Sequence, residues 1–202
     1  MYINNIMSNL FKNLEYEAFR QGINPRTQQS REWFRKQAAQ LTNVNRGKLM
    51  QEEEITLRSR QIIGSMCMFF YDPKGKEELP YYDRFPLSII IGPAAGGFYG
   101  INLHYLPPTL RAKFLDSLLE VTNNKAYDQT TRFKVTYDLL QRAAKFKYFK
   151  PCFKHYLSDH VRSKFAYVNP PEWEIATFLP TADFAKVGKS IVYKDSRRKM
   201  NQ

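Results

Sequence analysis

Two apolar runs separated by a short connection form the centre of the sequence. The runs cover residues 87–91 and 98–105, and the connection, residues 92–97, is rich in glycine, proline and alanine. Three consecutive isoleucines in the first run favour a buried strand over a helix, because β-branched side chains fit a pleated surface. The second run is close to the alternation of a half-buried strand. The pattern predicts an antiparallel hairpin, with residues 66–71 as a third strand.

Helical spacing of apolar residues characterises the chain before this predicted sheet. Apolar side chains recur at near-helical intervals over residues 3–21. A second helix is expected to begin near residues 27–30, with Trp33 and Phe34 on its buried stripe. The acidic run at residues 51–54 favours the start of another helix, because carboxylates stabilise the first helical turn.

The chain after the sheet is also expected to be mainly helical. Pro107 and Pro108 are typical of a helix start, and a further helix is expected over residues 128–144. The predicted fold class is α+β, with a small antiparallel, SH3-like or barrel-like sheet around residues 62–106 packed with flanking helices. We expect a single domain over the whole chain, with a basic helical arm at residues 1–60 and a helical, basic part at residues 107–202.

The positive charge lies outside the predicted sheet. The chain has a net charge of +12 and a pI of about 9.7. Residues 1–60 hold 10 basic and 6 acidic side chains, a net charge of +4. Residues 61–125 hold 6 of each and are neutral. Residues 126–202 hold 15 basic and 7 acidic side chains, a net charge of +8. A neutral sheet with basic flanks suggests a polyanionic partner. The alternative is a charge that keeps an assembly subunit soluble.

The strongest candidate for a polyanion contact is the basic aromatic segment, residues 142–164. Its seven basic side chains stand against one acid, Asp159, and are interleaved with phenylalanine and tyrosine. Cations can neutralise phosphates, and aromatic rings can stack on unpaired bases. With rings such as Phe149 and Tyr156, the segment suits contact with frayed DNA ends or single strands. The alternative places the rings in the core, so the basic residues are the firmer part of the prediction. They are Arg142, Lys145, Lys147, Lys150, Lys154, Arg162 and Lys164.

A second group of predicted DNA contacts lies on the expected second helix. It consists of Arg26, Arg31, Arg35 and Lys36. These residues fall mainly opposite the stripe that contains Trp33 and Phe34. The alternative is an ordinary solvated helix face.

Signatures of catalysis and of metal binding are weak. His155 and Asp159 are four residues apart and could share a helix face, but the sequence offers no further ligands nearby. Carboxylates at residues 72–83 could suit a magnesium nuclease, yet they flank turns where Asp and Glu are common. There is no P-loop, nucleophile elbow or dinucleotide fingerprint. We therefore predict no enzymatic activity, no metal and no cofactor.

The remaining features bear on the setting of the protein. Cys67 and Cys152 belong to no C-x-x-C pair, so reduced thiols are expected in a cytosolic setting. No apolar run reaches the roughly 18 residues that a membrane span requires. The start of the chain does not follow the order of a signal peptide. We expect neither a membrane nor a small-molecule substrate as partner.

Four blocks of sequence resemble a family of phage proteins. In chain order they are PRTxxSREWFRK, MFFYDPKGKEELPYYDRFP, GGFYGINLHYLPPTLRAKFLDSL and PCFKHYLSDHVRSKFAYVNPPEW. They resemble small virion proteins of large contractile-tailed phages, and most closely the DNA end protector, or head-completion, group of T-even-like phages. The resemblance runs from Pro25 to about Tyr193 and carries no family-defined contact residues.

The resemblance implies a non-enzymatic virion protein, present in the host cytoplasm during assembly. Such a protein would bind the ends of linear double-stranded DNA, protect them from host exonuclease and take part in head completion and head–tail joining. Other virion proteins, at the portal and neck or at the baseplate, would be its partners. Two other functions remain open at this point: a purely structural baseplate, neck or tail subunit, and a single-strand-binding accessory of replication.

Overall fold

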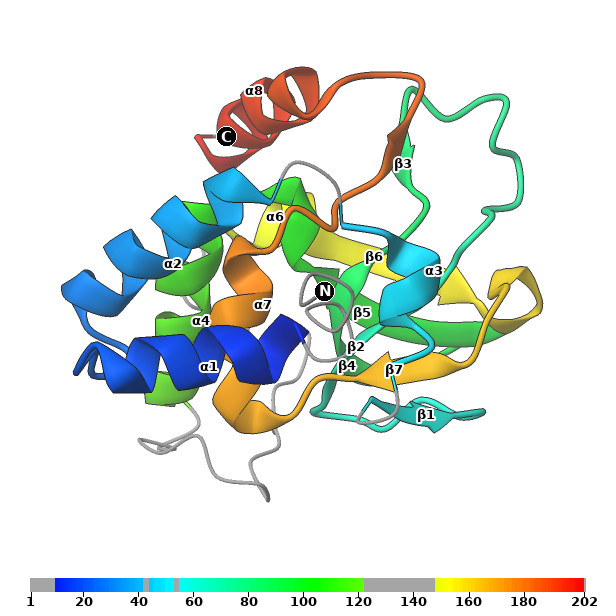
Figure 1. Cartoon of the computed structure of the whole chain (residues 1–202). Helices are drawn as coiled ribbons and strands as arrows, with labels where there is room; N and C mark the ends of the chain where they lie inside the picture. The colour runs from blue at the N-terminus through cyan, green and yellow to red at the C-terminus, as the bar shows by residue number, and fades with distance from the viewer. Residues whose placement is uncertain (1–9, 42–43, 53–54, 122–147, 202) are drawn as a thin grey trace.

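The computed structural model describes residues 10–41, 44–52, 55–121 and 148–201 (Figure 1). The predicted helix at 128–144 lies outside these ranges. The helices are α1 Leu10–Arg20, α2 Gln28–Gln40, α3 Arg46–Leu49, α4 Pro108–Val121, α6 Phe149–Cys152, α7 Trp173–Phe178 and α8 Lys189–Met200, with 3-10 turns η1 Leu103–Tyr105, η3 Ser158–His160 and η4 Pro170–Glu172. The strands are β1 Thr56–Arg58, β2 Met66–Met68, β3 Tyr82–Asp83, β4 Leu87–Ala94, β5 Gly97–Asn102, β6 Phe153–Leu157, β7 Phe165–Tyr167 and β8 Phe184–Ala185.

The fold is α+β, as predicted, and the predicted hairpin is its centre. The described strands form a six-stranded antiparallel sheet in the order β1-β7-β2-β4-β5-β6, and β3 pairs with β8 separately. These strands do not close into a barrel. β4 extends three residues further than expected, whereas β5 begins one residue earlier and already ends at Asn102, where η1 follows. Only Ala95 and Gly96 connect the two strands. Gly96 has a φ of +70°, which suits a tight turn.

The predicted boundaries of the sheet were too narrow. Half of the six-stranded sheet comes from outside residues 62–106, namely β1, β6 and β7. The part expected to be helical after residue 107 therefore supplies two of its strands, because β6 pairs with β5 and β7 pairs with both β1 and β2. The prediction of a helix that starts at the acidic run, residues 51–54, is also wrong, because Thr56–Arg58 forms a strand that pairs with β7.

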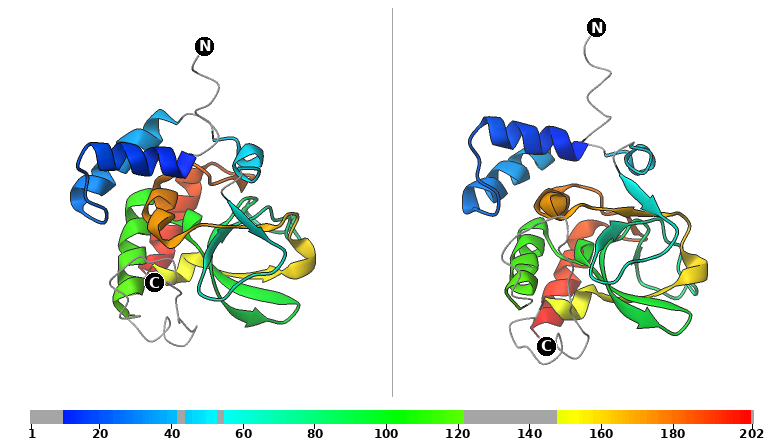
Figure 2. Two further views of the ribbon diagram at one scale, coloured as in Figure 1. Left: turned by 60° about the horizontal axis from the view of Figure 1, so that its bottom comes forward. Right: turned by 90° about the horizontal axis from the view of Figure 1, so that it is seen from below.

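The longer helices gather on one side of the sheet, and α8 crosses above them (Figures 1 and 2). α7 contacts α1, α2 and α4, so it forms the centre of the helical layer. The side chain of Thr27 caps α2 by accepting from the backbone N–H of Ser30, and Trp33 and Phe34 are buried as predicted. α4 begins at Pro108, also as predicted. No helix in the described ranges is long and apolar enough to cross a membrane.

Both faces of the sheet are buried, which explains the three consecutive isoleucines. Ile89 and Ile91 belong to the main core beneath the helices. Ile90 points the other way, into a second, largely aromatic cluster. That aromatic cluster consists of Cys67, Phe69, Tyr71, Ile90, Phe98, Tyr156, Phe165 and Tyr167. A strand whose alternate residues face two separate cores needs apolar residues at successive positions, and this is the pattern of residues 89–91.

Candidate nucleic-acid interface

The predicted DNA-binding residues of the segment 142–164 lie on several elements. Arg142, Lys145 and Lys147 are outside the described residues. Lys150 is exposed on α6, and Arg162 and Lys164 are exposed between η3 and β7. Lys154 is different, because it lies on β6 and lines a cavity.

In the second predicted group, Arg31 and the backbone of Arg26 have partners within the protein, whereas Arg35 and Lys36 are exposed. Arg31 forms an ion pair with Asp116 of α4, so much of its charge is compensated within the protein. The backbone N–H of Arg26 donates to Glu174 Oε2 at 2.8 Å. Arg35 and Lys36 are exposed on α2. They remain predicted phosphate contacts.

Arg35 also lies beside cations from other helices. It lines a recess of about 410 Å³ together with Lys113 of α4. A neighbouring recess brings Arg35 together with Lys189 of α8. Burial and the nearby Arg111 and Arg46 lower the pKa of Lys189, which reflects the positive potential of this surface.

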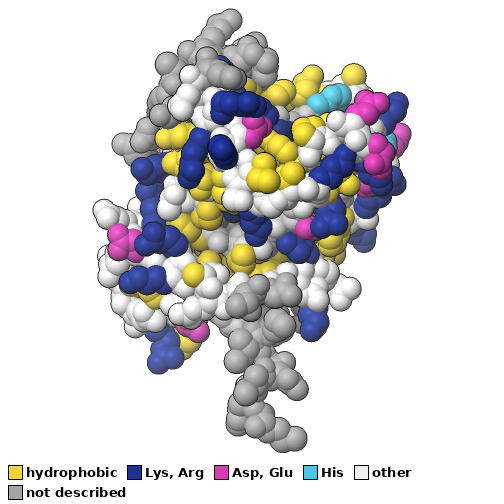
Figure 3. Space-filling view, turned by 90° about the horizontal axis from the view of Figure 1, so that it is seen from above, with side chains coloured by type: hydrophobic (Ala, Val, Ile, Leu, Met, Phe, Trp, Pro, Cys, Tyr) yellow, Lys and Arg dark blue, Asp and Glu magenta, His cyan; other side chains and the backbone are white. Residues whose placement is uncertain are grey.

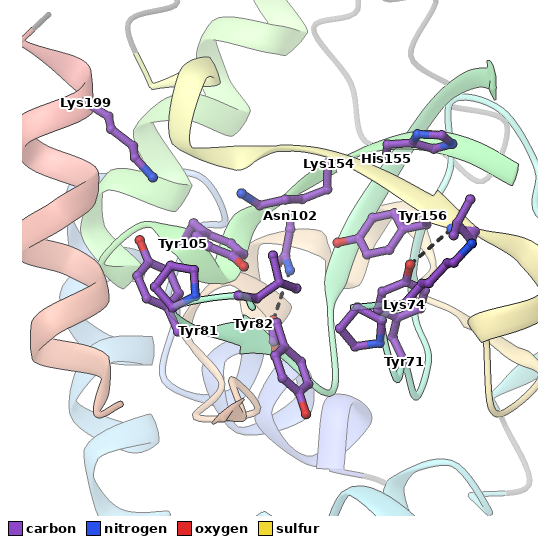
Figure 4. A pocket seen from close by; sticks show the side chains of 15 residues that line it. Tyr71, Lys74, Tyr81, Tyr82, Asn102, Tyr105, Lys154, His155, Tyr156 and Lys199 are labelled. Atoms are coloured by element: carbon purple, nitrogen blue, oxygen red, sulfur yellow. Dashed lines mark hydrogen bonds between the residues drawn. The ribbon is translucent and has the colours of Figure 1, made fainter. Parts of the chain in front are cut away.

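A cavity of about 450 Å³ opens between α8, the segment that leads into β3, and strands β5 and β6 (Figure 4). Aromatic and cationic side chains make up most of its wall. It is lined by Tyr71, Pro73, Lys74, Leu79, Pro80, Tyr81, Tyr82, Asp83, Asn102, Tyr105, Lys154, His155, Tyr156, Leu157 and Lys199. Its volume lies in the range of roughly 300–1,000 Å³ that is usual for ligand sites.

The pairing of β5 with β6 places Lys154 and Tyr156 at this cavity. Gly100 lies opposite Lys154 in the register, and Phe98 lies opposite Tyr156. A Cβ atom at Gly100 would lie 2.4 Å from Ser88 Oγ and 3.1 Å from Tyr156 Cε2. The absence of a side chain at Gly100 therefore leaves the space that the Tyr156 ring occupies.

The ammonium group of Lys154 has an aromatic neighbour and no ion pair with a described carboxylate. Its Nζ atom lies 3.7 Å from the centre of the Tyr105 ring, in a cation–π contact. No ion pair joins it to a carboxylate in the described part of the chain. Burial, with a smaller contribution from Lys199, lowers the pKa of Lys154 to about 8. The cavity therefore contains a cation that forms no ion pair with any described carboxylate.

Helix α8 brings a second ammonium group to the cavity. Lys199 Nζ lies 2.9 Å from Asp195 Oδ2, and Tyr81 Oη donates to the same carboxylate. These two hydrogen bonds lower the pKa of Asp195 to about 2. The sequence analysis did not include Lys199 among the candidate contacts. The available signal was the four-residue spacing of Asp195 and Lys199, which favours one helix face.

Two tyrosine hydroxyls at the cavity can each donate a further hydrogen bond. Tyr156 Oη is enclosed and forms no hydrogen bond of good geometry with the described residues, although the Asn102 amide is near enough to moderate its raised pKa. Tyr71 Oη accepts from the backbone N–H of Leu157 at 3.1 Å, which leaves its own proton available. Burial raises the pKa of both hydroxyls, so both remain protonated donors at neutral pH.

The rings suggested for base stacking are part of the core. Phe149 is 5% exposed and Tyr156 is 3% exposed. The Tyr156 ring stacks on Phe98, with centroids 5.3 Å apart, inside the aromatic cluster. The alternative that placed these rings in the core is therefore correct. Tyr81 and Tyr82, which line the cavity and are half-buried, present more accessible rings.

A buried polar network supports the cavity from behind. His104 Nδ1 lies 2.7 Å from Asp83 Oδ2, and His104 Nε2 lies 3.0 Å from Thr181 Oγ1. The order of groups resembles a catalytic triad, but Thr181 is 1% exposed and His104 is 0% exposed. Neither His104 nor Thr181 lines the cavity, so the arrangement presents no nucleophile or base to a ligand there. The His104 ring contacts two side chains, one at each nitrogen.

No cluster of three or more potential metal ligands occurs among the described residues. His155 and Asp159 do not share a helix face, because His155 lies on strand β6. Its ring forms no hydrogen bond with a carboxylate in the described ranges. His155 Nε2 lies 2.9 Å from the carbonyl oxygen of Ala95. Cys67 and Cys152 are free and buried. Burial raises the pKa of the Cys152 thiol to about 12.

Comparison with known proteins gives one clear result. A family model described as the phage T4 terminal DNA protecting protein matches residues 4–200. Neither the curated proteins nor the solved structures give a significant match. The family model spans nearly the whole chain, including every element of the cavity. The chain therefore belongs to the family of the phage T4 terminal DNA protecting protein.

Proposed function

We propose that the protein binds the ends of linear phage DNA and shields them from host exonuclease. The observation that carries this proposal is the family match over residues 4–200. The cavity that contains Lys154 and Lys199 supports it, because two ammonium groups and several hydroxyl donors suit a phosphate-bearing ligand.

Contact with the rest of the DNA would come from cations on the surface. Figure 3 shows dark blue side chains over much of the face that bears α8, with few magenta ones among them. Lys150, Lys164 and Arg35 are exposed cations of the two predicted groups. Such residues contact phosphates without reading bases, so binding would not depend on sequence. A protein seated on the terminus protects it by occupying the place where an exonuclease must begin.

This function requires no chemical step by the protein itself. The enclosed arrangement of Asp83, His104 and Thr181 is accounted for by its structural role, and we propose a non-enzymatic protein. We further propose that it resides in the virion, acts during head completion and head–tail joining, and contacts proteins of the portal and neck. These proposals follow the resemblance to end protectors.

A binding experiment and a protection experiment test the proposal together. Fluorescence anisotropy on a linear duplex should show an affinity that falls steeply as salt rises, because bound phosphates release counter-ions. The same duplex should survive longer with a processive exonuclease when the protein is present. Absence of binding at low salt would reject DNA binding and favour a purely structural neck, tail or baseplate subunit. Binding without protection would reject the protective role.

A further inference from the structure

We propose that the cavity between α8, β5 and β6 receives the terminal nucleotide of a DNA strand, with its 5′-phosphate between Lys154 and Lys199. The inference rests on the proposed function and adds the means by which an end would be distinguished from internal DNA. Figure 4 shows both lysine side chains extending into the cavity from opposite sides, above the Tyr105 ring.

The charge balance of the cavity favours a phosphate. Lys154 has no carboxylate partner among the described residues, and Lys199 shares Asp195 with Tyr81 and Arg198. The remaining carboxylate of the wall, Asp83, is already occupied by His104 and Asn102. A phosphate group would supply the counter-charge that the fold leaves out.

The hydroxyl groups of the wall complete the recognition. Tyr156 Oη is an enclosed donor without a good partner in the described structure, and Figure 4 shows it directed into the cavity. A buried polar group without a hydrogen bond destabilises a fold, so its presence at a ligand site is explained most simply by a ligand that satisfies it. The Tyr71 hydroxyl, which accepts from Leu157, can donate to the same ligand.

The size of the cavity explains a preference for ends. About 450 Å³ accommodates a ligand of nucleotide size. An internal nucleotide is joined to neighbours on both sides and cannot enter without bringing both of them. A frayed terminal nucleotide has one neighbour, and its base can stack on a half-buried ring such as Tyr81 or Tyr82.

The test compares DNA ends that differ only in phosphate. A labelled linear duplex with 5′-phosphates is displaced by three unlabelled competitors: the same duplex, its 5′-hydroxyl form and a closed circle. For the unmodified protein we expect the phosphorylated duplex to compete about 10- to 100-fold better than the other two, as for a charge-assisted contact. Equal competition by all three would overturn the inference while leaving general DNA binding intact. No binding of any DNA would reject the proposed function as well.

Two substitutions locate the effect. Lys154→Met keeps the aliphatic stem and should reduce the preference for phosphorylated ends at least tenfold, with affinity for the circle nearly unchanged. Tyr156→Phe removes one oxygen that has no good partner in the described structure, so the variant should fold at least as well as the natural protein. It should still weaken the preference for phosphorylated ends several-fold. Lys164→Gln is the matched control for the end preference alone: it removes an exposed charge outside the cavity, so it should weaken binding of linear and circular DNA alike and leave the preference unchanged. An unaltered preference in both Lys154→Met and Tyr156→Phe would overturn the inference.

Discussion

At the scale of one residue, Lys154 is a side chain whose charged form suits a binding site but destabilises the folded protein. Burial lowers its pKa to about 8, which means that the fold disfavours the charged form. The pKa lies about 2.5 units below that of an ordinary lysine. At about 1.4 kcal/mol for each unit, this corresponds to roughly 3.5 kcal/mol at most. Ionisable groups held in such a state are concentrated at functional sites. The position of Lys154 at a cavity wall is consistent with that tendency.

The affinity for phosphorylated ends should fall as pH rises above about 8. The groups that face Lys154 are Cys152, Lys199, Asp195, Asp83 and Tyr105. Burial keeps Cys152 protonated, since its pKa is about 12, and Asp195 remains ionised because its pKa is about 2. Lys154 is therefore the group expected to lose its charge first, and each pH unit above 8 should weaken the contact by up to about tenfold.

Competition assays from pH 7 to pH 9.5 measure this effect. The phosphate dianion does not titrate in that range, because its second pKa is about 6. Lys154→Arg retains its charge throughout and should give a nearly flat profile. Identical profiles for the natural protein and Lys154→Arg would contradict the assignment of the titration to Lys154.

The same residue shows what sequence could and could not reveal at this scale. Composition alone was enough to include Lys154 among the predicted DNA contacts. Its neighbour Tyr156 was misjudged as a possible stacking ring, because its environment depends on the register between β6 and β5. That register places it opposite Phe98, a residue 58 positions earlier in the chain. Local spacing contains no information about such a pairing.

Helix α8 is the element whose role was least visible in the sequence. Its inward face includes only two fully buried residues, Val192 and Ser196, and its other side is strongly basic. A weak apolar stripe next to a run of basic residues is typical of a flexible tail as well as of a helix. The contacts that fix it come from distant residues: Tyr81 bonds to Asp195, and Tyr193 Oη accepts from Arg111 at 2.9 Å.

Exposed cations of α8 should add general affinity without adding end recognition. Lys194 and Arg197 are exposed on this helix. Changing both to Gln should lower affinity for linear and circular DNA alike, and should reduce the slope of log affinity against log salt by up to about two units. Salt titrations on both forms of DNA measure the change. A loss of end preference with unchanged affinity for circles would show instead that Lys194 or Arg197 acts at the cavity.

The strands after residue 107 show a second limit at the scale of elements. β6 has five residues and β7 has three, so neither is long enough to establish a clear alternation. In β6 the inward residues are a lysine and a tyrosine, which obscures any apolar periodicity. By contrast, α2 and α4 carried capping residues and a proline at the expected helix starts, and both were predicted correctly.

At the scale of the whole molecule, one buried network joins distant parts of the chain. Asp83 on β3 binds His104 of η1, and it also accepts from the Asn102 amide at 3.0 Å and from the backbone N–H of Asp183 at 3.2 Å. Burial would raise the pKa of Asp83, but these partners hold it below its usual value. No sequence pattern indicates that residues 83, 104 and 181 meet, since each lies in a different segment.

This network predicts how the stability of the molecule depends on His104 and on pH. His104→Ala removes the hydrogen bond from the neutral imidazole to the buried Asp83 carboxylate, and should lower the free energy of unfolding by about 1.5–3 kcal/mol. Burial lowers the pKa of His104, so the folded protein holds it neutral while the unfolded chain binds a proton below about pH 6.5. The stability of the natural protein should therefore fall as pH drops below 6.5, and His104→Ala should lack this part of the fall.

Urea unfolding at pH 7 and pH 5.5, followed by the fluorescence of the buried Trp33 and Trp173, measures both effects. His155→Ala is the matched control, because His155 is exposed and its ring contacts only a backbone carbonyl among its described hydrogen bonds. It should change stability by less than about 1 kcal/mol. If His104→Ala were as stable as His155→Ala, the network would not hold β3 against η1. The wall of the cavity, which includes Asp83 and Asn102, would then owe its shape to the aromatic cluster alone.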